Sequence, residues 1–92
     1  MDPVDKTFDE TTFLNAALIR AARGLLGLSQ GELASLAAIS TRTLSKIESG
    51  AEPRPDKRRR ENLQAIRVVL EERGIEFIFP DHQTGEGVRR RR

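Results

Sequence analysis

Residues 29–50 read SQGELASLAAISTRTLSKIESG, and this stretch predicts two short helices joined by a tight turn. Ser29 can cap the first helix, because its hydroxyl can accept a hydrogen bond from the amide of Glu32 while the Glu32 carboxylate accepts one from the amide of Ser29. Ser40, eleven residues later, is placed to cap a second helix. Two helix starts this close leave room for only about two turns of helix between them, which is the spacing of a helix-turn-helix.

The apolar residues of this stretch agree with two helices that pack against a common core. Leu33, Leu36 and Ala37 mark the inner face of the first helix. Leu44 and Ile47 mark that of the second. The outer face of the second helix then holds five hydrogen-bonding side chains and no carboxylate: Thr41, Arg42, Ser45, Lys46 and Ser49. Such a face suits a nucleic-acid groove, where phosphates and base edges present mainly acceptors to Arg and Lys.

The same stretch resembles the helix-turn-helix of the phage Cro and CI repressors and their small bacterial relatives, the xenobiotic-response-element family. The shared features are the Ser-Gln start, the Glu-Leu-Ala that follows, the serine before the second helix and the Ile-Glu-x-Gly ending. The resemblance implies a mainly α, lambda-repressor-like helix-turn-helix domain of about four helices with a C-terminal β-hairpin. Ala38 departs from the pattern, because many relatives have Gly in the turn with a positive φ angle. An Ala there implies either backbone strain or a slightly different turn.

The resemblance also implies how the domain docks, with the second helix of the motif in the major groove of double-stranded DNA. Three residues are predicted to face base edges: Thr41, Arg42 and Lys46. Seven residues are predicted to hold phosphates: Gln30, Ser40, Thr43, Ser49, Arg54, Lys57 and Arg58. We expect a homodimer on a palindromic operator. Repression is the expected effect, because a dimer on an operator blocks polymerase without any further activity.

The segment before the motif predicts another helix, which starts at about Asp9 or Thr12 and ends near Gly27. Its inner stripe is five residues at helical spacing: Leu14, Ala17, Leu18, Ala21 and Leu25. Arg20 and Arg23 lie off this stripe. They can reach phosphate or remain solvated, and solvation is the simpler interpretation.

The segment after the motif predicts a loop and a long helix. Two prolines make residues 51–56 an extended loop. Asp56 is placed to cap a helix that runs to about Arg73, and Gly74 provides its stop. The inner stripe of this helix is Leu63, Ile66, Val69 and Leu70.

Four cations, at residues 57–60, occupy the start of this long helix. Cations at a helix N-terminus oppose the macrodipole and cost about a few tenths of a kcal/mol each when exposed. A nearby DNA phosphate would reverse the sign of that cost, because the helix amides and the basic side chains both attract it. The alternative is an ordinary solvated run of charge.

Residues 75–92 change from a helical to an alternating pattern. Apolar residues on both faces of 75–79 predict a strand that ends at Pro80, and turn formers follow it. Val88 can begin a second strand, but Arg90 stands where an apolar residue would be more usual, so the final arginines can instead form a basic tail. A hairpin with two apolar faces needs a partner, which predicts a dimer through five residues: Ile75, Phe77, Ile78, Phe79 and Val88.

Length and composition limit the other possibilities. Ninety-two residues allow one small domain, which we divide into a leader (1–8), a helix-turn-helix domain (9–74) and a hairpin (75–92). There is no Cys, and His82 is the only histidine, so we expect neither a metal site nor a catalytic triad, and no enzyme or cofactor. No apolar run approaches the roughly 20 residues that span a bilayer, so we expect a cytoplasmic protein without a membrane partner.

The charge is unevenly distributed along the chain. The net charge is +2, but residues 1–10 carry −3, which leaves +5 for the remainder. A basic body with an acidic leader points toward nucleic acid more than toward a membrane. Small domains are often basic, so this signal alone does not decide.

Two other functions fit the same motif. The chain can be the antitoxin of a toxin–antitoxin pair, which binds its own promoter and also a toxin, although neither terminus looks like a dedicated toxin-wrapping arm. It can also be a general nucleic-acid binder. Co-purification of a second polypeptide would identify the first, and titration with competitor DNA would identify the second.

Overall fold

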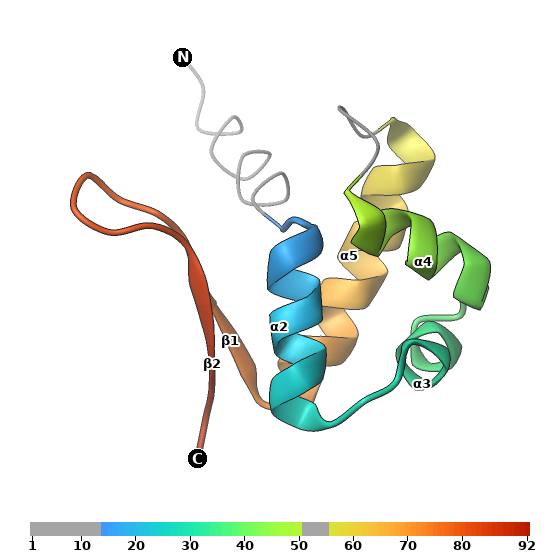
Figure 1. The fold of residues 1–92 in the computed structure, drawn as a ribbon, viewed down its shortest axis with the longest axis horizontal. Coiled ribbons are helices and arrows are strands. Elements are labelled where there is room, and N and C mark those ends of the chain that lie inside the picture. Colours follow the sequence, from blue (N-terminus) through green and yellow to red (C-terminus); the bar gives the residue numbers. More distant parts are fainter. Residues whose placement is uncertain (1–13, 51–55) are drawn as a thin grey trace.

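The computed structural model describes residues 14–50 and 56–92, and within these ranges it contains four helices and one hairpin (Figure 1). The elements are α2 (Ala16–Leu26), α3 (Gln30–Leu36), α4 (Thr41–Ser49), α5 (Lys57–Glu72), β1 (Ile75–Ile78) and β2 (Gly87–Arg90). This arrangement confirms the mainly helical class with a C-terminal hairpin. The predicted leader, residues 1–8, lies outside the described ranges, as does Arg54.

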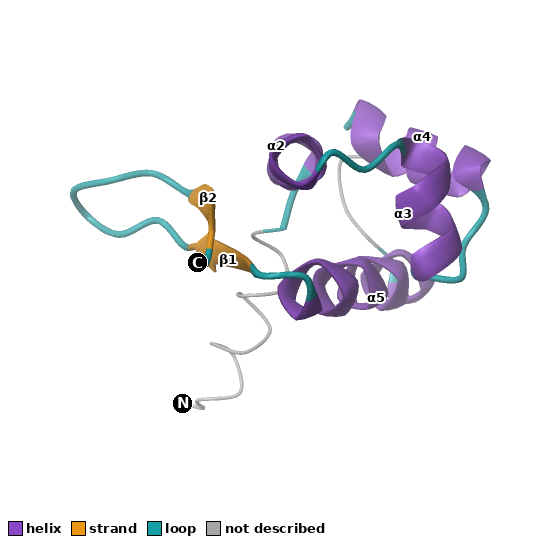
Figure 2. Ribbon diagram, turned by 90° about the horizontal axis from the view of Figure 1, so that it is seen from below, coloured by secondary structure: helices purple, strands orange, loops and turns teal. Residues whose placement is uncertain are grey.

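The helices α2 and α5 form the centre of the molecule. Figure 2 shows α3 and α4 on one side of this pair and the hairpin on the other. The hairpin contacts α2 through β2 and α5 through β1. Among the described residues, fourteen buried apolar side chains make one continuous core, and they come from all four helices, β1, Leu14 and Ala37. None of the helices in the described part of the chain is long and apolar enough to cross a membrane.

The predicted helix caps are confirmed. The Ser29 hydroxyl accepts from the Glu32 amide at 3.0 Å, and the Ser29 amide donates to the Glu32 carboxylate at 2.8 Å, which completes a capping box at the start of α3. Ser40 caps α4, and Asp56 caps α5. Because each cap depends only on residues within one turn, the sequence alone was enough to locate it.

The turn between α3 and α4 contains a strained residue. Ala38 has φ 60°, the left-handed conformation that favours glycine. Its amide donates to the Ser35 carbonyl at 3.2 Å, and the Ile39 amide donates to the Ala34 carbonyl at 3.0 Å. These two bonds form a Schellman motif, which needs a left-handed residue at position 38. Of the two alternatives for this turn, the structure therefore has the strained one.

The helix α2 differs from its prediction in both its start and its buried face. Asn15 has an extended backbone and its side chain accepts from the Leu18 amide at 2.9 Å, so α2 starts at Ala16. The predicted starts, Asp9 and Thr12, lie outside the described residues. Its buried residues are Leu18, Ile19 and Ala22. Three residues of the predicted stripe are exposed instead: Ala17, Ala21 and Leu25. Apolar residues occupy most positions of AALIRAARGLL, so the spacing alone allowed a neighbouring face to be chosen.

One residue of α3 is also corrected. Leu36 was expected on the inner face, but it is 42% exposed. It is the last residue of α3, and the residue that follows it, Ala37, is the one buried in the core. The stripe of α5 is confirmed, with Leu63, Ile66 and Leu70 buried and Val69 packed against the core.

The hairpin forms through Arg90, so the strand and not the basic tail is observed up to that residue. Phe77 lies opposite Val88 and Ile75 lies opposite Arg90. Arg90 takes the place of an apolar residue because its guanidinium reaches the end of α2 and donates to the Leu25 carbonyl at 3.3 Å. Cations suit helix C-termini, where carbonyls lack partners within the helix.

Candidate nucleic-acid interface

The outer face of α4 is a polar surface held by an apolar inner face. Leu44 and Ile47 are buried against the core. The five residues predicted to point outward are all exposed: Thr41, Arg42, Ser45, Lys46 and Ser49. Among the described residues, the side chains of Arg42 and Lys46 make no ion pair. Two cations are therefore free to reach an external acceptor from one helix face.

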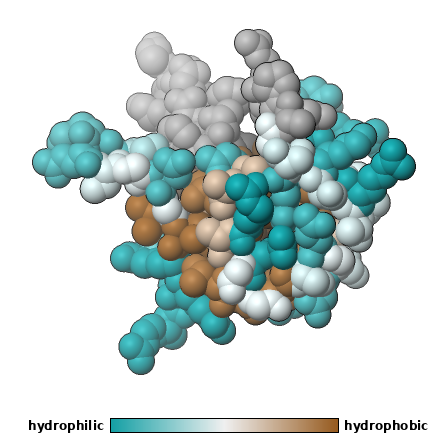
Figure 3. Space-filling model, in the orientation of Figure 1, coloured by the Kyte–Doolittle hydropathy of each residue, from teal (hydrophilic) through white to brown (hydrophobic). Residues whose placement is uncertain are grey.

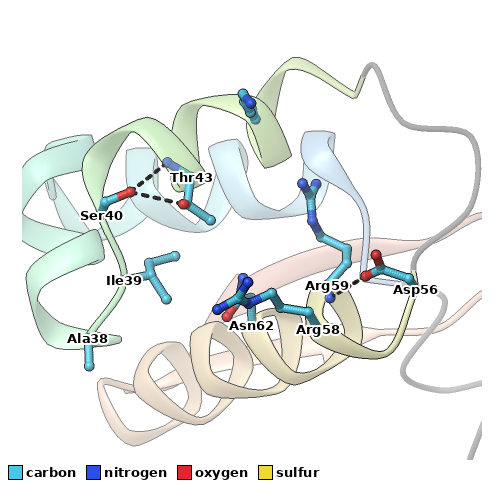
Figure 4. A pocket seen from close by; sticks show the side chains of 9 residues that line it. Ala38, Ile39, Ser40, Thr43, Asp56, Arg58, Arg59 and Asn62 are labelled. Carbon is cyan, nitrogen blue, oxygen red and sulfur yellow. Dashed lines mark hydrogen bonds between the residues drawn. The ribbon is translucent and has the colours of Figure 1, made fainter.

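A groove separates α4 from the start of α5 (Figure 4). Its volume is about 490 Å3. Among the described residues that line it, three are basic, Lys46 from α4 and Arg58 and Arg59 from α5, and one, Asp56, is a carboxylate. The fold thus brings two segments that are separate in the sequence to one basic groove, beside the polar face of α4.

The predicted phosphate-binding residues have different surroundings. Lys57 and Arg58 are exposed at the start of α5. The Ser40 hydroxyl donates to the Thr43 hydroxyl at 2.9 Å, and the Ser49 hydroxyl donates to the Lys46 carbonyl at 2.7 Å. Arg54 lies outside the described residues. A phosphate contact by any of them remains a prediction.

Gln30, the remaining predicted phosphate contact, is already bonded inside the protein. Its amide nitrogen donates to a carboxylate oxygen of Glu48 at 3.0 Å. Glu48 is 4% exposed, which is unusual for a carboxylate. The Gln30 amide nitrogen has two N–H donors and uses one of them for Glu48, so a phosphate contact by the other remains a prediction.

Glu48 is the centre of a polar cluster that the sequence did not predict. Arg23 donates to both of its carboxylate oxygens, each at 2.8 Å, and to the Leu28 carbonyl at 2.9 Å. Arg20 donates to the Glu48 backbone carbonyl. We call these four residues, Arg20, Arg23, Gln30 and Glu48, the Glu48 junction. It joins α2, α3 and α4 in one hydrogen-bonded network.

The Glu48 junction corrects the interpretation of Arg23 as a solvated charge, whereas Arg20 is exposed to solvent and also donates to the Glu48 backbone carbonyl. Their sequence position, off the apolar stripe, was compatible with solvent. A carboxylate next to buried Ile47 was the signal that could have revealed their role, because a buried carboxylate needs a cationic partner. The arginines fix the position of α4, the helix that carries the outward polar face.

The junction is ionised at neutral pH. Burial by itself would raise the pKa of Glu48, but hydrogen bonds from Arg23 and Gln30, together with the charges of Arg23 and Arg20, outweigh it and lower the pKa below its usual range. The hydrogen bond to Glu48 raises the pKa of Arg23. The network therefore holds a permanent ion pair, not a protonated acid.

The five predicted dimer residues also divide by position. Ile75 and Phe77 are buried in the protein's own core, and Phe79 and Val88 pack against that core. Ile75 and Phe77 therefore belong to the core of their own chain, and a contact of either side chain with a partner remains a prediction. Ile78 lies on the opposite face, beside the ion pair of Arg89 with Glu76 at 3.0 Å.

A comparison with known protein families agrees with this geometry. Residues 19–59 match the family model described as helix-turn-helix. The match runs from within α2 to the start of α5, so it includes both helices of the motif and the Glu48 junction. No curated protein matched the chain.

Proposed function

We propose that the protein is a sequence-specific transcriptional repressor. Residues 19–59 form a helix-turn-helix domain of the Cro/CI type, and such DNA-binding domains are typical of non-enzymatic regulators. In this proposal it binds a palindromic operator as a homodimer. The observation that carries the proposal is the basic groove between α4 and α5, which adjoins an exposed helix face without carboxylates.

Base recognition is assigned to α4. Arg42 is exposed and has the length and fork geometry to donate to O6 and N7 of a guanine in the major groove. Lys46 lies four residues further, on the same side of the helix, and Thr41 lies at its first turn. These side chains supply donors where base edges supply acceptors.

Phosphate contacts are assigned to the two sides of the groove. Lys57 and Arg58 add positive charge at the start of α5, where the helix amides also favour an anion. A phosphate there would offset the unfavourable position of these cations at a helix N-terminus. Such contacts fix the register of the protein on DNA without reading its sequence.

Homodimerisation is proposed because one α4 helix contacts only a few base pairs. Two copies related by a two-fold axis place two recognition helices about 34 Å apart, one turn of DNA. A dimer that covers an operator in this way excludes polymerase without any catalytic activity. Repression is therefore the simplest regulatory effect.

The experiment that tests the proposal is selection of bound sites from random double-stranded DNA by the full chain. We expect one enriched palindrome with half-site centres about 10 base pairs apart. Titration with unrelated DNA should then leave a bound fraction that only the selected site competes away. Binding without enrichment would show a general nucleic-acid binder and would overturn the proposal.

A further inference from the structure

No strand in the described part of the chain pairs with the outer edge of β2. The Arg91 amide donates to the Gly74 carbonyl at 2.7 Å, which makes Gly74 and Arg91 a hydrogen-bonded pair of the antiparallel ladder. Bonded and non-bonded pairs alternate along such a ladder, so the backbone groups of Val88 and Arg90 point away from β1. Within the described part of the chain, no backbone or side-chain group is bonded to them. An unpaired edge of this kind is a template for another strand.

An uncharged stripe of α2 lies next to this edge. Ala17, Ala21 and Leu25 are exposed along one side of the helix, and β2 packs on α2. Leu25 is 42% exposed, among the largest exposures of any large apolar residue that the structure describes. Figure 3 shows apolar surface on this face of the molecule, between the hairpin and α2. Edge and stripe together make one surface that none of the residues in 14–50 and 56–92 covers.

We propose that this surface binds a second copy of the chain, with β2 antiparallel to the partner's β2 and Val88 opposite the partner's Val88. This inference rests on the proposed homodimer and names its interface. In this register each Val88 exchanges both outward hydrogen bonds with its symmetry mate. Two hairpins then form one four-stranded sheet, and the α2 stripes meet beside it. Small side chains on α2 let the two helices approach closely.

The charges beside the edge select this register over its neighbours. With Val88 on the two-fold axis, Glu86 lies opposite the partner's Arg90, and this pair occurs twice. A register centred on Arg89 would place Arg89 opposite its own copy, and one centred on Arg90 would do the same with Arg90. Like charges that face each other across a ladder are destabilising. Only the Val88 register is self-complementary among the three.

Glu86 and Arg90 are available for this pairing. Both are exposed, and their bonds within the chain are long: Glu86 accepts from the Asn15 amide group at 3.4 Å, and Arg90 donates to the Leu25 carbonyl at 3.3 Å. By contrast, Arg89 and Glu76 already form an ion pair at 3.0 Å on the other face of the hairpin. That face has Ile78 as its apolar residue, which is too little for a dimer interface.

Charge reversal in the full chain tests the register by sedimentation equilibrium. Arg90→Glu alone and Glu86→Arg alone place like charges opposite each other, and each should weaken the dimer about tenfold or more. The combined variant restores opposite charges and should recover the wild-type dissociation constant to within about threefold. An equimolar mixture of the two single variants should form a heterodimer, because the carboxylates of one chain then face the guanidinium groups of the other. As a matched control, the combined Glu76→Arg and Arg89→Glu variant exchanges the charges of the other face and should dimerise like wild type.

The outcomes separate this inference from the proposed function. A heterodimer from two single variants cannot arise from misfolding, so it would support the register even where each variant alone is unstable. If the wild-type chain is monomeric, or if neither the combined variant nor the mixture recovers the dimer, the interface proposed here is wrong. Enrichment of a DNA site by that same wild-type chain would then leave the DNA-binding function standing, whereas failure to enrich any site would remove the function itself.

Discussion

Arg23 of α2 and the cations of α4 carry the same charge but lie in opposite environments. Arg23 has a side chain that is 21% exposed and bonds both oxygens of Glu48, so its charge is used inside the protein. Arg42 and Lys46 are exposed, and their side chains make no ion pair with any residue that the structure describes. A count of basic residues would treat the two groups alike. The partner, and not the charge, distinguishes a cation that supports the fold from one that can bind DNA.

The two groups are nevertheless coupled through one helix. Glu48 belongs to α4, so the arginines of α2 hold the helix that presents Arg42 and Lys46. A substitution in the Glu48 junction should lower the stability first and the DNA affinity as a consequence. A substitution of Arg42 or Lys46 should lower the DNA affinity and leave the stability unchanged. The following predictions test this separation.

The largest effect is expected for Glu48→Ala. It leaves Arg23 and Gln30 without their acceptor at a buried site, and breaking a buried ion pair by removing one partner costs about 3 kcal/mol or more. The loss is expected at the lower end of that range, because Arg23 can turn partly toward solvent. Urea unfolding followed by circular dichroism measures it.

A double-mutant cycle and a pH series provide the controls. Glu48→Ala combined with Arg23→Met should lose less stability than the sum of the two single variants, and simple additivity would contradict the junction. The lowered pKa of Glu48 contributes stability that is present above its unfolded-state pKa of about 4.3 and is lost as the pH falls through the folded-state pKa. Glu48→Gln should therefore show a weaker loss of stability than wild type below about pH 4.3.

The next largest effect is a loss of DNA affinity on substitution of Arg42 in α4. Arg42→Ala should weaken binding to the selected operator by about 1–3 kcal/mol, because a bidentate contact to guanine is lost. Binding to unrelated DNA and the urea midpoint should both change little. If operator and unrelated DNA lose affinity equally, Arg42 contacts only phosphate.

A smaller effect is expected at the start of α5. Arg58→Ala should reduce the slope of log affinity against log salt by about one unit, because one phosphate contact releases about one counterion. The preferred DNA sequence should stay the same. Arg73→Ala, at the other end of the same helix, is the matched control and should leave the slope unchanged. An equal slope for all three proteins would return the basic start of α5 to a solvated run of charge.

The sequence predicted those features that depend on near neighbours. Ser29, Ser40 and Asp56 cap helices through bonds to residues three positions away, and Gly50 ends α4 with φ 70°. The alternating pattern of the hairpin was local in the same sense. The Glu48 junction was not local, since Arg23 and Glu48 are 25 positions apart and only the packing of α2 on α4 brings them together.

The buried face of α2 was predicted wrongly for a related reason. Its sequence is apolar at most positions, so helical periodicity could not choose between the stripe of Leu25 and that of Ile19. The choice is made by the elements that pack on α2, and these are distant in the sequence. The exposed stripe of α2 is the one next to the outer edge of β2, where we propose that a second copy of the chain binds.

The smallest effect is expected for Ala38→Gly, which should change the stability but not the DNA affinity and which alters no charge. Ala38→Gly relieves the left-handed strain at φ 60°, which costs about 1–2 kcal/mol for a residue with a Cβ. Glycine also gives the unfolded chain more freedom, which cancels about 0.5–1 kcal/mol of the gain. The net stabilisation should be about 0.5 kcal/mol, read as a higher urea midpoint with an unchanged slope. Operator affinity should not change, because Ala38 precedes α4 and removal of a methyl group leaves every donor of that helix in place.

Combined with Glu48→Ala, the substitution should return the same increment of stability, since the two sites share no hydrogen bond. A loss of stability in the single variant would show that the turn accommodates Ala38 without strain. A change in operator affinity would show that the turn itself positions α4 on DNA, and the separation between the two groups of cations would then be incomplete.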